Sequence, residues 1–182
     1  MKNGTNIWKK RMTFFEIVSS NSDYCEKVQN VDNTKFAIIY KDVAMDIILG
    51  ISRCGECVFI DKTKVYMINN KNEFMYCSKL VEIPYNLIIE NMHNEFVDLM
   101  CLDNFNMSEI FPFFEIVEFV FNNLINYYWI DLAWLWYQNF SIVEKNKLVD
   151  ALQNLINEKR ISQNKRQEIK KEYESILKML NK

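Results

Sequence analysis

Cys54 and Cys57 are separated by two residues, a spacing that suits half of a zinc site or a redox-active thiol pair. A structural zinc site needs four ligands, but the chain has no second pair of cysteines at this spacing. The other candidate ligands are irregularly spaced: Cys77, His93 and Cys101. A redox role would need a strand–helix–strand context, which the residues around the pair do not show. We therefore expect free thiols and no bound metal.

Glu90 and His93 match the Glu-x-x-His pattern of di-iron helical bundles, and Glu115 and Glu118 offer further carboxylates. Such bundles use two of these motifs, whereas His93 is the only histidine in the chain. A Ser-His-Asp or Cys-His mechanism would depend on the same histidine, and no serine lies in a Gly-x-Ser-x-Gly elbow. Three glycines, none of them grouped, leave no phosphate-binding loop. We expect no enzymatic activity, no cofactor and no small-molecule substrate.

Charge is strongly segregated along the chain. Residues 80–144 contain ten carboxylates and no lysine or arginine, so all 22 basic residues lie on either side of this segment. The net charge of −2 therefore conceals an acidic middle between two basic ends. Segregated charge is informative about binding partners. The acidic segment favours a basic protein as the partner, and the pI near 5.6 argues against nucleic acid.

Two groups of residues are candidates for contacting such a partner. Carboxylates would steer and orient a basic surface, and the candidates are Glu90, Glu95, Asp98, Glu115 and Glu118. Tyrosine and tryptophan dominate interface hot spots, and the candidate anchors are Tyr127, Trp134, Trp136 and Tyr137. The sequence leaves an alternative open, in which lysines and arginines from the two ends fold over the acids and neutralise them.

The sequence pattern predicts that the elements that position these residues are mostly helices. Three glycines and two prolines provide little of the turn chemistry that an all-β fold needs. Apolar spacing and capping signals predict helices over residues 7–20, 34–53, 84–100, 108–128 and 141–159, and a last one from Ser162. Short strands or a small β-hairpin are expected within residues 57–76. The predicted fold is mainly α, a single-domain helical bundle over residues 1–182 that ends in a helical hairpin at 141–181.

The expected location is the cytoplasm. Glu16 interrupts the apolar run that follows the basic residues near the start, so this stretch does not resemble a signal peptide. Residues 110–130 are long and apolar, but Glu115 and Glu118 would make membrane insertion unfavourable. An odd number of cysteines, five, fits a compartment in which thiols stay reduced.

The C-terminal hairpin, through the segment 147–163, resembles the helical endings of immunity proteins from bacterial contact-dependent growth inhibition systems. The resemblance covers about a fifth of the chain, and no functional residue is carried over from it. It implies a bacterial cytosolic protein that binds and neutralises one cognate toxin, and the acidic segment suggests a nuclease as that toxin. The rival interpretation is a regulatory or scaffolding helical interaction module unrelated to toxins. The toxin's fold and substrate, the mode of inhibition and the oligomeric state stay open.

Overall fold

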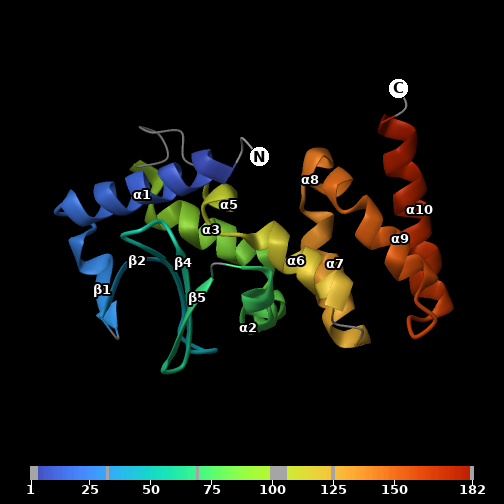
Figure 1. The fold of residues 1–182 in the computed structure, drawn as a ribbon, viewed down its shortest axis with the longest axis horizontal. Helices are drawn as coiled ribbons and strands as arrows, with labels where there is room; N and C mark the ends of the chain where they lie inside the picture. The colour runs from blue at the N-terminus through green and yellow to red at the C-terminus, as the bar shows by residue number, and fades with distance from the viewer. Residues whose placement is uncertain (1–3, 32, 69, 99–105, 124–125, 181–182) are drawn as a thin grey trace. The chain divides into compact units, whose positions relative to one another are not determined.

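Five antiparallel strands, joined in simple sequential order, occupy much of the first part of the chain (Figure 1). They appear in a computed structural model that describes residues 4–31, 33–68, 70–98, 106–123 and 126–180. The strands are β1 (Val28–Val31), β2 (Thr34–Asp42), β3 (Ile47–Ser52), β4 (Cys57–Asp61) and β5 (Lys64–Ile68). The helices that accompany them make this an α+β fold.

The prediction of a mainly α bundle is therefore wrong, and its main error is the helix predicted over residues 34–53. This stretch forms the hairpin of β2 and β3, whose turn places Asp46 at a φ of 53°. All but one residue of β3 is buried, so the strand reads as a continuous apolar run rather than an alternating one. Periodicity cannot separate such a run from a buried helix, although its isoleucines favour a strand. The strands expected within residues 57–76 are confirmed as β4 and β5.

Helices cover one face of the sheet. Helix α1 (Gly4–Ser20), expected at residues 7–20, packs on β2 and β3, with Phe14 and Val18 fully buried. Helix α3 (Tyr85–Glu95) buries Ile88 and Met92, and Figure 1 shows it on the same side of the sheet as α1. Phe96, just after α3, meets Phe14 edge to face with ring centroids 5.2 Å apart. These aromatic contacts join the two helices.

The opposite face of the sheet carries a separate apolar cluster. Phe36, Val58 and Ile60 are buried there, with partly buried aliphatic neighbours from β1, β2, β3 and β5. Gly50 lies among them, and a Cβ atom at this position would be only 2.6 Å from Cδ2 of Phe36. The absence of a side chain at Gly50 thus makes room for the Phe36 ring.

The chain divides into two compact units: Met1–Cys77 with Asn86–Phe113, and Ser78–Tyr85 with Phe114–Lys182. The single domain predicted from the sequence stays a prediction, since two compact units can belong to one cooperative domain. The second unit contains the short helix η3 (Ser78–Glu82) and the helices α6 (Phe113–Asn123), α7 (Tyr127–Gln138), α8 (Ile142–Lys147), α9 (Val149–Asn157) and α10 (Gln163–Leu180). Shorter pieces of the first unit are η1 (Cys25–Lys27), η2 (Lys71–Glu73), α2 (Phe74–Cys77) and α5 (Met107–Ile110).

The helix predicted over residues 108–128 is interrupted. Asn106, rather than Ser108, caps α5 and accepts a hydrogen bond from the backbone N–H of Ser108. Pro112 precedes α6, and Asn126 caps α7 by accepting from the N–H of Tyr128. A break in a helix shows in the sequence as a shift in the position of its polar face. This region is apolar nearly all round, so the sequence pattern did not reveal the breaks.

The predictions for the C-terminal region are largely confirmed. Ser141 and Glu144 form the reciprocal hydrogen bonds of a capping box at the start of α8. The helix predicted over residues 141–159 is divided at Leu148 into α8 and α9. Ser162 accepts from the N–H of Lys165 at the start of α10, which packs against α9. The expected antiparallel hairpin is thus present.

Candidate protein-binding surface

The acids on helix α3 make the clearest candidate for a charged binding surface. Pro84, whose fixed φ suits the first turn of a helix, precedes α3. Glu90 and Glu95 on α3 and Asp98 just beyond it are all exposed, while the opposite side of the helix is buried. We call Glu90, Glu95 and Asp98 the acidic α3 surface. Three of the nine predicted contact residues are therefore exposed within a single unit.

Part of the charge on the acidic α3 surface is neutralised. Lys27 of η1 forms an ion pair with Glu95 and also lies 5.8 Å from the centroid of the Phe96 ring. Within the described residues, no ion pair reaches Glu90 or Asp98. Burial, helped by the negative charge of Asp98, raises the pKa of Tyr24. Glu90 and Asp98 therefore carry the uncompensated charge of this surface.

The alternative in which the basic ends cover the acidic segment holds in part. In the described part of the chain, acids of residues 80–144 pair with lysines outside that segment: Lys10 with Glu109 at 2.7 Å, Lys27 with Glu95, and Lys165 with Asp131 at 3.1 Å. All three carboxylates keep about half of their side-chain surface in solvent. Surface pairs of this kind contribute little to stability, and they reduce the net negative field that a partner would meet.

Glu115 and Glu118 are less accessible than the carboxylates of the acidic α3 surface. Both lie on α6 in the second unit, are half-buried, and already have an interaction within the chain. Their spacing along one side of the helix was read correctly from the sequence, but partial burial limits what a partner could contact. We therefore leave them out of the candidate surface.

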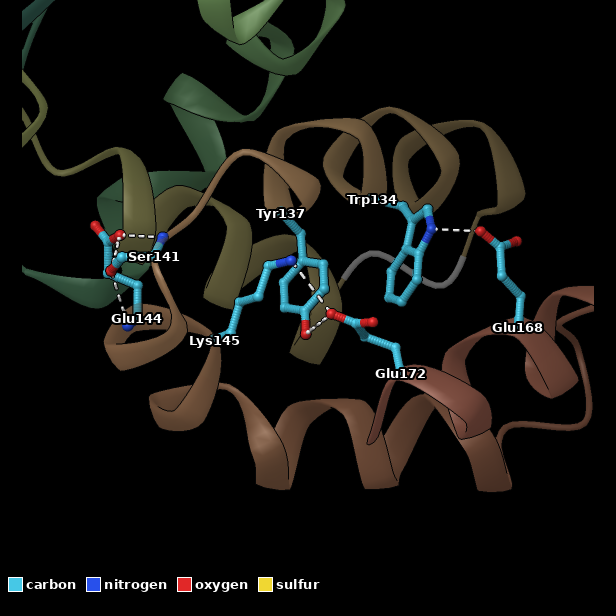
Figure 2. A network of polar contacts seen from close by, with 7 residues as sticks. All are labelled: Trp134, Tyr137, Ser141, Glu144, Lys145, Glu168 and Glu172. Carbon is cyan, nitrogen blue, oxygen red and sulfur yellow. Dashed lines mark hydrogen bonds and ion pairs between the residues drawn. The ribbon is translucent and has the colours of Figure 1, made fainter. Parts of the chain in front are cut away.

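The aromatic anchors are mostly inside the second unit. Trp134, Trp136 and Tyr137 have 3%, 1% and 0% of their surface exposed. Their polar atoms donate hydrogen bonds within the chain: Trp134 to Glu168 at 2.6 Å, Trp136 to the carbonyl of Ile83 at 2.8 Å, and Tyr137 to Glu172 at 3.4 Å. Figure 2 shows the indole of Trp134 and the phenol of Tyr137 reaching the acids of α10. These three residues are therefore core residues that hold α10 and η3.

Only Tyr127 among the predicted anchors is exposed, and its neighbours on α7 were missed. Tyr128 is 52% and Leu135 62% exposed, compared with 47% for Tyr127. Residues 128 and 135 are two helical turns apart, so a helical projection of the sequence could have placed them on one face. Tyr128 also donates a hydrogen bond to Glu82 at 2.7 Å, which fixes its orientation.

The thiols occupy different environments. Cys54 is exposed, whereas Cys57 is buried in β4 with its Sγ 3.9 Å from the carbonyl oxygen of Ile110. Burial raises the pKa of Cys77 well above its usual value, so this thiol stays protonated near neutral pH. Cys101 lies outside the described residues. Over those residues, no group of three or more potential ligands is placed to hold a metal ion.

None of the described helices is both long enough and apolar enough to cross a bilayer. No protein-family model, curated protein or solved structure matches the chain.

Proposed function

We propose that this chain is an immunity protein that neutralises a basic protein toxin by binding it stoichiometrically, without turnover. The class of toxin that we favour is a nuclease. The observation that carries the proposal is the exposure of Glu90 and Asp98 beside α3 with no ion pair among the described residues. Residues 80–144 supply no lysine or arginine that could neutralise them. The place of action is the cytoplasm of the cell that the protein protects.

A nuclease suits this surface because nucleases bind the phosphate backbone through lysine and arginine side chains. Exposed carboxylates attract such a surface and orient it during encounter. The same carboxylates repel nucleic acid itself, so a basic protein is a better partner than DNA or RNA.

The test starts with the gene directly upstream: where it encodes a toxin, the toxin domain is purified as the binding partner for surface-plasmon measurements. The variant Glu90→Lys with Asp98→Lys should associate at least about tenfold more slowly than the unmodified protein at low salt, because steering is lost. Raising the salt from about 0.01 M to about 1 M shortens the screening length from roughly 30 Å to 3 Å and should slow the unmodified protein in the same way. Glu174→Lys on α10 is the matched control, since Glu174 is an exposed acid outside the candidate surface.

Growth provides the second readout. Expression of the toxin domain should arrest cells, co-expression of the unmodified protein should restore growth, and the double reversal should restore it less. Circular dichroism verifies that the variants are folded. Equal association rates for the folded double reversal, together with association that does not depend on salt, would contradict the proposal. The absence of any toxin gene beside this one would favour the regulatory or scaffolding module instead.

A further inference from the structure

Two apolar side chains are exposed on the same side of α3 as its acids. Leu87 has 44% and Val97 has 52% of its surface in solvent, whereas α3 buries Ile88 and Met92 on its other side. All four residues belong to the first unit. Single exposed apolar residues are common on protein surfaces, so the position of these two relative to the carboxylates decides whether they matter.

The exposed residues of this segment share one helical face. The N–H of Phe96 donates to the carbonyl of Met92 at 3.2 Å, so helical hydrogen bonding continues past Glu95, and residues 97 and 98 are helical too. At 3.6 residues per turn, five exposed positions fall within an arc of roughly 100°. They are Leu87, Glu90, Asn94, Val97 and Asp98, and we call them the outer α3 face.

The outer α3 face combines charge with apolar surface. Glu90 and Asp98 are its acids, and no ion pair reaches either of them in the described part of the chain. Leu87 and Val97 lie near its two ends, ten positions apart, which corresponds to about 15 Å along a helix. The face therefore offers two apolar contacts with negative charge between and beside them.

An α-helix is the element that best fits the outer α3 face. The backbone N–H and C=O groups inside a helix are used by the helix itself, so an extended strand would find no backbone partners here. A second helix satisfies its own backbone and packs through side chains alone. Because Leu87 and Val97 are about 15 Å apart, only a helix that runs nearly along α3, as in packing at about 20°, covers both of them.

The charge of the outer α3 face selects the chemistry of that helix. A second copy of the chain would bring Glu90 and Asp98 against the same acids, and like charges on facing helices are destabilising. Nucleic acid and anionic lipid surfaces are repelled for the same reason. A helix with lysine or arginine between two apolar side chains complements the face in both respects.

We infer that the outer α3 face binds one basic amphipathic helix of a partner protein, which Leu87 and Val97 hold and which Glu90 and Asp98 steer. The inference rests on the proposed function, in which this helix belongs to the toxin. It supplies apolar anchors within the first unit, where the aromatic anchors expected on α7 do not lie. The bound helix carries two apolar side chains about ten residues apart, since they must span the same 15 Å or so.

The anchors and the steering groups act on different rate constants. Apolar contacts form after the encounter and hold the complex together, so their loss raises the off-rate at any salt concentration. Loss of a steering charge lowers the on-rate, and this effect disappears as salt screens the charge. The two signatures separate a failure of this inference from a failure of the proposed function.

The first probe is a stapled helical peptide of about sixteen residues, because shorter or unstapled helices are marginal in water. It carries leucine, lysine, lysine and leucine at positions i, i+3, i+7 and i+10 in a background of alanine and glutamine. An NMR titration of the full chain should show saturable shifts of backbone amide signals, concentrated on the outer α3 face. A peptide with both leucines replaced by glutamine has the same charge and should bind at least about tenfold more weakly.

Protein variants locate the anchors. Leu87→Gln with Val97→Gln should reduce binding of the leucine peptide to the level of the leucine-free peptide. The matched control is Leu135→Gln with Val43→Gln, which removes the same two residue types from exposed positions elsewhere. This control should bind the leucine peptide as the unmodified protein does. Glutamine is a good helix former, and circular dichroism verifies that both double variants are folded.

The toxin domain, where the neighbouring gene encodes one, is the second probe. In surface-plasmon measurements Leu87→Gln with Val97→Gln should raise the off-rate at least about tenfold and change the on-rate less than about twofold. If the off-rate is unchanged while Glu90→Lys with Asp98→Lys still slows association, the proposed function stands and this inference fails.

The peptide results can overturn the inference without any toxin. No saturable shifts, shifts away from the outer α3 face, or equal binding of the leucine-free peptide would each do so. A mass that rises with protein concentration, and that Leu87→Gln with Val97→Gln returns to that of the monomer, would identify a second copy as the occupant and would also overturn it.

Discussion

Trp134 and Tyr137 stack face to face, with ring centroids 4.8 Å apart and planes inclined by 18°. A lysine covers each outer face of the pair: Lys165 lies 5.3 Å from the Trp134 ring and Lys145 lies 5.0 Å from the Tyr137 ring. Glu168 and Glu172 of α10 accept the hydrogen bonds of the two aromatic side chains (Figure 2). Stacking, cation–π contacts and charged hydrogen bonds together attach α10 to α7.

Removing the acceptor of Trp134 should destabilise the protein. Glu168→Ala leaves a buried indole N–H without its partner, and we expect a loss of about 1–3 kcal/mol in the free energy of unfolding. Urea unfolding followed by tryptophan fluorescence measures the loss. Glu174→Ala, on the exposed side of α10, should change the free energy by less than about 0.5 kcal/mol. In a Trp134→Phe background, Glu168→Ala should have much less effect, and an undiminished effect would refute the role of this hydrogen bond.

A methyl group at Gly50 should disturb the second face of the sheet. The Cβ of Gly50→Ala would lie 2.6 Å from Cδ2 of Phe36 and 2.9 Å from the carbonyl oxygen of Ala37. We expect a loss of about 1–3 kcal/mol from overpacking, measured by thermal or urea unfolding. Phe36→Leu should be less harmful in the Gly50→Ala background than alone, because it relieves the clash with the ring. If the losses in the free energy of unfolding from Gly50→Ala and Phe36→Leu simply add in the double variant, the contact with Phe36 is not the cause of the destabilisation by Gly50→Ala.

Ionisation of Tyr40 should be delayed to high pH. Burial, reinforced by the negative charge of Asp42, raises the pKa of Tyr40 to about 12 from its ordinary value of 10.0. The neutral phenol is the form favoured by folding, so its contribution to stability is complete below pH 10 and is lost as the pH rises toward 12. The absorbance difference at high pH between the unmodified protein and Tyr40→Phe reports this ionisation. A difference that develops around pH 10 in the folded protein would contradict the prediction.

The cysteines should react in two classes. Cys25 and Cys54 are exposed and should be alkylated by iodoacetamide under native conditions, whereas Cys57 and Cys77 are buried and should react only after unfolding. Peptide mass mapping assigns the modified residues. The same reaction in denaturant is the control for intrinsic reactivity. Rapid native labelling of Cys57 would show that β4 is not packed as described.

The sequence by itself determined features that depend on neighbours along the chain. The capping box of Ser141 and Glu144, the helical hairpin and the start of α10 at Ser162 all follow from residues three or four positions apart. The hairpin of β4 and β5 was also readable, because its turn residues Lys62 and Thr63 separate two short apolar stretches. The acidic character of residues 80–144 is likewise a property of the sequence alone.

Only the tertiary structure decided which of these features reach solvent and which pair with distant residues. The segment 34–53 forms strands whose apolar side chains are buried on both faces of the sheet. In such a segment the spacing of apolar residues cannot distinguish a strand from a buried helix. Lys27 reaches Glu95 across 68 residues, and Lys10 reaches Glu109 across 99, so no local rule could foresee which acids are compensated. Trp134 and Tyr137 are buried because α10 folds back over α7, and this long-range packing turned expected surface anchors into core residues.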